Sequence, residues 1–119
     1  MKLKYDYVVK KRKIVIELET VDFTPKEIAA LDVLGEPVVS FQKTYPGGIT
    51  ISLSKKIRSE FKARIRIDGS ANIDAANEAG QKFLVDIKDE LTSTMEKLID
   101  EYEDQVFPPM HGALDISNY

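Results

Sequence analysis

The chain has 119 residues with a formal net charge of −3, and 43% of its residues are hydrophobic. This length fits one domain around a single core, and no apolar run reaches the roughly 18 residues that a membrane-spanning helix needs. Cysteine is absent, which excludes disulfides and cysteine-ligated metals, so we expect a cytoplasmic protein without a membrane partner.

The first 21 residues contain two stretches with the period-two alternation of half-buried strands. The four basic residues KKRK at positions 10–13 separate the two stretches, and we expect a hairpin that turns there. Because KKRK lacks the Asn-Gly or glycine-rich chemistry of tight hairpins, one long bent strand is the alternative. The apolar positions are Leu3, Tyr5, Tyr7 and Val9, followed by Ile14, Ile16 and Leu18.

A short helix is predicted from about residue 25 to 34. Thr24 supplies an N-cap hydroxyl, Pro25 suits the first helical position, and Glu27 completes a capping box. The helix is expected to end at Gly35. The expected apolar face of this helix is Ile28, Leu31 and Leu34.

From residue 37 to 69 the alternation returns to a period of two, which predicts three further strands. The first two are separated by YPGG, in which Pro46 and Gly47 suit the centre of a type II turn. The third strand follows a turn near residues 58–60. We expect these strands to form an antiparallel meander with one apolar and one polar face.

The last periodic segment predicts one long helix, which Asn72 or Asp74 can cap and which Pro108 and Pro109 end. Over roughly thirty residues it would measure about 45–50 Å, more than the width of a small domain. We therefore expect part of it to extend past the sheet, where something else must cover it. Its apolar stripe is Ile73, Ala76, Gly80, Phe83, Leu84, Ile87, Leu91, Met95, Leu98 and Tyr102.

Together these segments predict an α+β protein of order β-β-α-β-β-β-α, with a short and a long helix on one face of a single antiparallel sheet. We expect one domain over residues 1–106 and a flexible tail over 107–119. In element order the chain is similar to the ribosome-hibernation factor domain, and its last five elements follow the succession of a double-stranded-RNA-binding domain. That family carries a lysine cluster where this chain reads NIDAANEAGQKF, so the resemblance implies the order of elements and not the RNA contacts.

The C-terminal half of the long helix is the predicted contact surface for another protein. Four acids lie in its last turns, where the helix dipole is already negative and each acid costs roughly 0.3–1 kcal/mol at low salt. Positive charge from residues 2–13, from a second subunit or from a basic partner would offset this repulsion. We expect a homodimer here; the alternatives are cover by the N-terminal hairpin, a solvated acidic helix, and an acidic inhibitor that mimics nucleic acid. The predicted contact residues are Leu91, Met95, Leu98, Asp100, Glu101, Tyr102, Glu103 and Asp104.

The basic segment 55–66 suggests a second kind of partner. Strand alternation places its basic side chains opposite Phe61 and Ile65, on a polar face that could contact phosphates. That face lacks aromatic rings for base stacking, because Phe41 and Tyr45 also fall on the apolar side. Nucleic-acid binding is therefore the alternative function, and a solvated basic strand is the simpler explanation. The residues of this alternative site are Lys56, Lys62, Arg64 and Arg66.

No catalytic or cofactor motif is present. The single histidine, His111, has no second histidine or cysteine with which to bind a metal, and Gly47 with Gly48 belongs to a turn. We therefore expect no enzyme activity, no cofactor and no metal. The compact, charge-polarised chain resembles the small accessory proteins of phages and mobile elements, which implies a binding or assembly role.

Overall fold

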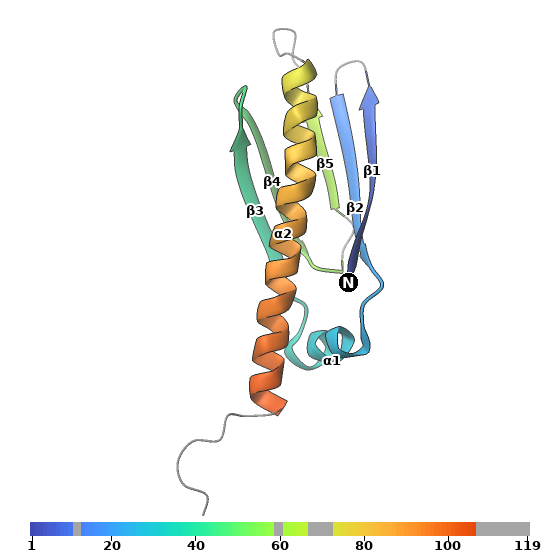
Figure 1. The fold of residues 1–119 in the computed structure, drawn as a ribbon, viewed down its shortest axis with the longest axis vertical. Coiled ribbons are helices and arrows are strands. Elements are labelled where there is room, and N and C mark those ends of the chain that lie inside the picture. Colours follow the sequence, from blue (N-terminus) through green and yellow to red (C-terminus); the bar gives the residue numbers. More distant parts are fainter. Residues whose placement is uncertain (11–12, 59–60, 67–72, 107–119) are drawn as a thin grey trace, which may run out of the picture.

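The computed structural model describes residues 1–10, 13–58, 61–66 and 73–106. It shows an α+β protein whose elements follow the predicted order, with a long helix lying across two antiparallel sheets (Figure 1). The prediction of a single sheet is wrong, because the strands are divided between these two sheets. The predictions for the tail 107–119 and for a cap at Asn72 fall outside the described residues.

The first sheet has three strands in the order β1-β2-β5. β1 (Lys2–Lys10) pairs antiparallel with β2 (Lys13–Val21), and Lys10 lies opposite Lys13, which confirms the predicted hairpin. β5 (Phe61–Arg66) pairs with the other side of β2. β2 is thus the central strand, and β1 is an open edge of this sheet.

The second sheet consists of β3 (Val38–Tyr45) and β4 (Ile49–Lys56), which pair antiparallel. The turn between them has Gly47 and Gly48 at φ values of 95° and 74°, a region that glycine adopts without steric cost.

The predicted meander is wrong because β5 pairs with β2 and not with β4. Ile65 lies opposite Ile14 and Phe61 opposite Leu18, so β5 brings apolar positions into register with the most deeply buried strand. The Thr20 hydroxyl donates to the carbonyl oxygen of Ile57 at 2.5 Å, and this buried hydrogen bond holds the chain after β4 against β2. This hydrogen bond links residues that are 37 positions apart in the chain.

Helix α1 spans Pro25–Leu34 and begins with the predicted capping box. The Glu27 amide donates to the Thr24 hydroxyl at 3.2 Å, and the Thr24 amide donates to the Glu27 carboxylate at 2.8 Å. The buried side differs from the predicted one: Ala30 and Leu31 are buried, while Ile28 is exposed. Glu27 also turns inward, so the inner face follows the 27, 30, 31, 34 spacing of a helix.

Helix α2 spans Ile73–Val106, and its 34 residues correspond to about 51 Å at 1.5 Å per residue. No helix in the described part of the chain is long and apolar enough to cross a membrane. In its first half α2 packs against the strands, where Phe83 meets Phe41 edge to face at 5.4 Å between ring centres. The buried positions of α2 are Ala76, Ala79, Gly80, Phe83, Ile87, Leu91, Met95 and Leu98.

A close approach of β1 to α2 explains the glycine inside this helix. A Cβ at Gly80 would lie 2.7 Å from the Tyr7 hydroxyl, so an alanine does not fit beside the ring. The same hydroxyl donates to Oδ1 of Asn77 at 2.6 Å. Gly80 thus lets Tyr7 dock β1 onto the helix.

The second half of α2 extends past the strands and is covered by α1 (Figure 1). Ala30 and Leu31 of α1 belong to the same core as Met95 and Leu98. Lys26 at the start of α1 also forms an ion pair with Glu103. The predicted overhang exists, but α1 covers it within the chain, and α1 was not among the predicted covers.

Candidate protein-binding surface

The predicted contact residues at the end of α2 separate into two groups. Leu91, Met95 and Leu98 are only 1%, 4% and 7% exposed, so they belong to the core and are not on the surface of the folded chain. Of the remaining residues, Tyr102 and Glu103 are half-buried and the others are exposed. The acidic part of the predicted surface is therefore accessible, whereas its hydrophobic part is covered.

The acidic end of α2 is only partly compensated. Glu103 pairs with Lys26, while Asp100, Glu101 and Asp104 make no ion pair with any described residue. The last turn of the helix contains no basic residue that would favour the negative end of the dipole. These three acids are consequently a solvated negative surface.

The residues of the alternative nucleic-acid site lie in two different sheets. Lys56 is the last residue of β4, whereas Lys62, Arg64 and Arg66 lie on β5, which pairs with β2. In the backbone register Lys62 is opposite Glu17, so an acid on β2 adjoins the basic strand. Nucleic-acid binding stays a prediction, which salt-dependent binding of a labelled oligonucleotide would test.

A largely apolar groove lies beside the open edge strand. It runs between β1 and α2 and has a volume of about 570 Å³. Because no described strand pairs with the outer side of β1, the groove is open along that edge in the part of the chain that the structure describes. We call it the β1–α2 groove; it is lined by Met1, Lys2, Leu3, Tyr5, Leu84, Val85, Lys88, Leu91 and Thr92.

Large apolar side chains are exposed at this groove. Tyr5 lies on the inner face of the sheet, opposite the buried Leu18, yet about half of it is exposed. Val85 of α2 is 61% exposed. Both side chains line the groove. Clustered exposure of this kind marks contact surfaces more often than scattered apolar residues do.

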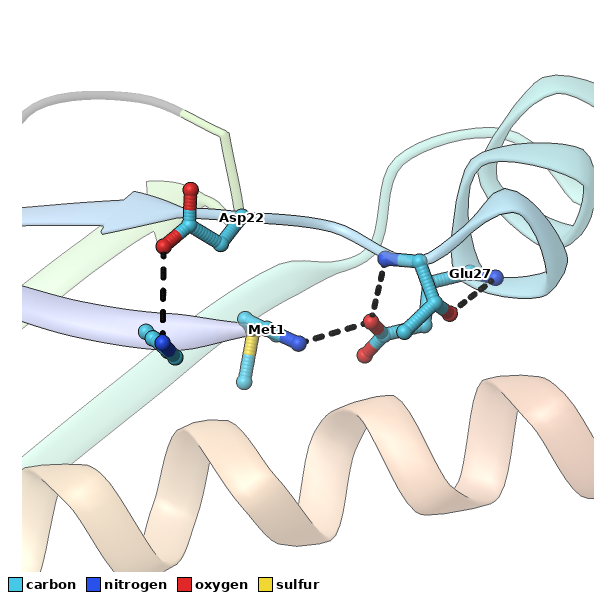
Figure 2. A network of polar contacts seen from close by, with 5 residues as sticks. Met1, Asp22 and Glu27 are labelled. Atoms are coloured by element: carbon cyan, nitrogen blue, oxygen red, sulfur yellow. Dashed lines mark hydrogen bonds and ion pairs between the residues drawn. The ribbon is translucent and has the colours of Figure 1, made fainter.

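The start of β1 is fixed at one end of the groove by a polar network (Figure 2). The Met1 ammonium donates to the Glu27 carboxylate at 2.7 Å, and Lys2 lies 3.8 Å from Asp22. Burial alone would raise the pKa of Glu27, but hydrogen bonds from Met1 and Thr24 lower it below its ordinary value. The network joins the start of β1 to α1 and to the end of the chain segment that leads into it.

A second polar cluster holds α2 from its other side. Asp86 accepts from Lys43 and from Tyr45, both on β3, at 2.8 Å. These hydrogen bonds, chiefly the one from Lys43, lower the pKa of Asp86, while burial and the neighbouring carboxylate raise the pKa of Tyr45. Each polar group thus has a partner, and we assign the cluster to the attachment of α2 to the second sheet. Nowhere in the described ranges do three His, Cys, Asp or Glu side chains come together as a metal site.

Comparison of the chain with protein-family models, with curated proteins and with solved structures finds no match. The functional assignment therefore depends on the surface itself. The amino-acid pattern does not indicate the β1–α2 groove, although strand alternation places Tyr5 on the apolar face. The missing information was that β1 is an edge strand, which alternation within a strand does not encode.

Proposed function

We propose that this chain is a non-enzymatic binding protein that acts through protein–protein contacts, with the β1–α2 groove as its contact surface. The exposed apolar side chains of the groove are the observation that supports this function. The chain buries its helix overhang with α1 but leaves Tyr5 and Val85 uncovered. Burial of apolar area of this kind is the main driving force of protein association.

The charges beside the groove add selectivity to this proposed contact. Lys2 and Lys88 lie at the groove, whereas Asp100, Glu101 and Asp104 form the negative surface farther along α2. Charges around a contact surface mainly affect the rate of association and exclude partners that carry the same charge at the matching position.

Two valines with equal exposure provide a matched test. Val85 in the groove and Val33 on α1 are each 61% exposed and each lie on a helix. Val85→Glu places a charge where a partner would remove water, and we expect it to weaken association about tenfold or more, whereas Val33→Glu should leave association unchanged. The measurement is sedimentation velocity of the purified chain, with affinity capture from host lysate as a parallel readout. Equal effects of the two variants would contradict the proposed surface.

A further inference from the structure

The outer edge of β1 has the backbone groups needed to accept another strand. β1 pairs with β2 along one side only, so its outward N–H and C=O groups have no strand partner in the described part of the fold. Charged side chains normally protect such an edge from pairing. On the outer face β1 carries Lys2, Lys4 and Asp6, so its charges have both signs. The mixed signs allow a strand with the complementary pattern to pair favourably.

β1 itself has that complementary pattern. Residues directly opposite each other in an antiparallel pair lie on the same face of the sheet. In a symmetric pair of two β1 strands, opposite residues must therefore both be even-numbered or both be odd-numbered, and the two-fold axis passes through one residue position. Each choice of that position gives a different set of facing charges.

Only an axis at Tyr5 separates like charges and still pairs most of the strand. It places Lys4 of each copy opposite Asp6 of the other copy, and Lys2 opposite Val8. An axis at Asp6 would place that acid opposite itself and Lys2 opposite Lys10, and an axis at Lys4 would place that lysine opposite itself. Since opposite charges across strands stabilise pairing and like charges oppose it, the charges select the axis at Tyr5.

We propose that the partner of the groove is a second copy of this chain, and that the two β1 strands pair antiparallel about Tyr5. This inference rests on the proposed function, because it names the partner of the same surface. The pairing joins two three-stranded sheets into one of six strands, with both α2 helices on the same face. On that face Leu3 lies opposite Tyr7 and the two Tyr5 rings face each other, so the exposed aromatic side chains of the edge acquire neighbours.

A pair of charge reversals tests this register. Lys4→Glu alone gives each dimer two acid–acid contacts, and Asp6→Lys alone gives it two lysine–lysine contacts. We expect each variant to dissociate about tenfold more readily than the wild type. In an equimolar mixture of the two variants, every facing pair of the mixed dimer again has opposite charges. The mixture should therefore regain dimers that neither variant forms alone.

The fold of each monomer provides an internal control for these variants. Within one chain Lys4 lies opposite Glu19 and Asp6 opposite Glu17. Asp6→Lys therefore replaces a like-charged cross-strand pair by an opposite one, so a loss of dimer in this variant does not result from a weakened monomer. Lys56→Glu, on β4 of the other sheet, makes the same charge change as Lys4→Glu and should leave association unchanged.

Light scattering after size exclusion, over a range of protein concentrations, separates the outcomes. The inference is supported if the wild type is a dimer of two 13.4 kDa chains, each charge reversal alone weakens that dimer, and the mixture of the two variants restores it. A dimer that resists both reversals but is weakened by Val85→Glu overturns the register and leaves the proposed function in place. A wild type that stays monomeric at all concentrations overturns self-pairing, and the Val85 and Val33 capture comparison then decides on the proposed function.

Discussion

The two sides of α2 carry similar apolar side chains but have different surroundings. On one side Phe83 and Ile87 are fully buried in the core. On the side toward β1, Val85 is largely exposed, and β1 has no outer neighbour among the described strands. The comparison shows that the composition of a helix face does not determine whether the face is covered. Coverage depends on which strands and helices the topology brings to it.

The largest predicted effect tests whether the buried side of α2 contributes more to the free energy of unfolding than the exposed side does. Phe83→Ala removes a fully buried ring that contacts Phe41, and we expect it to lower the free energy of unfolding by about 3–5 kcal/mol. Val85→Ala should change that free energy by less than about 0.5 kcal/mol, because the side chain is largely exposed. Urea unfolding of the two variants measures the difference. A similar loss in both would show that the groove is covered within the monomer.

An intermediate effect is expected where β1 meets α2. Alanine normally stabilises a helix relative to glycine by about 1 kcal/mol, but Gly80→Ala would place a Cβ against the Tyr7 hydroxyl. We expect a net destabilisation of about 1–3 kcal/mol from overpacking. In a Tyr7→Phe background the cost of Gly80→Ala should shrink, because the nearest atom is gone. A Gly80→Ala variant that is more stable than the wild type would contradict the docking of β1 on the helix.

The smallest effect concerns the network that joins β1 to α1. The pKa of Glu27 lies below its ordinary value of 4.5 in the folded chain, so its ionised form stabilises the fold above that value. This contribution is lost as the pH falls from about 4.5 through the lower folded pKa. Thermal unfolding of Glu27→Gln should therefore depend less on pH in this range than that of the wild type.

Local features of the fold could be predicted from the sequence. The capping box at Thr24 and Glu27, the turn at Gly47 and the length of α2 follow from interactions between residues close in the chain, and the structure confirms them. The partner of β5 could not be predicted in this way. The structure pairs β5 with β2 and not with β4, and the accompanying contact of Thr20 with Ile57 also joins residues far apart in the chain.

The candidate protein-binding surface could likewise be predicted only in part from the sequence. An apolar stripe containing Leu91, Met95 and Leu98 has the same spacing whether it faces the core or a second subunit. The side chains that favour burial could therefore be predicted from the sequence. That α1 is the element that covers them could not. The groove escaped prediction for the complementary reason: Tyr5 has the position of a buried residue, and only the sheet order leaves it exposed.

If α1 covers the overhanging end of α2 and a second copy binds at the β1 edge, association should protect the edge strand and leave the helix end unchanged. Hydrogen exchange read by mass spectrometry, at protein concentrations that favour monomer and dimer, distinguishes these regions. Slower exchange on association is expected in residues 2–8, with no change in residues 98–106. Slower exchange confined to residues 98–106 would contradict this expectation and would place the contact at the acidic end of the helix.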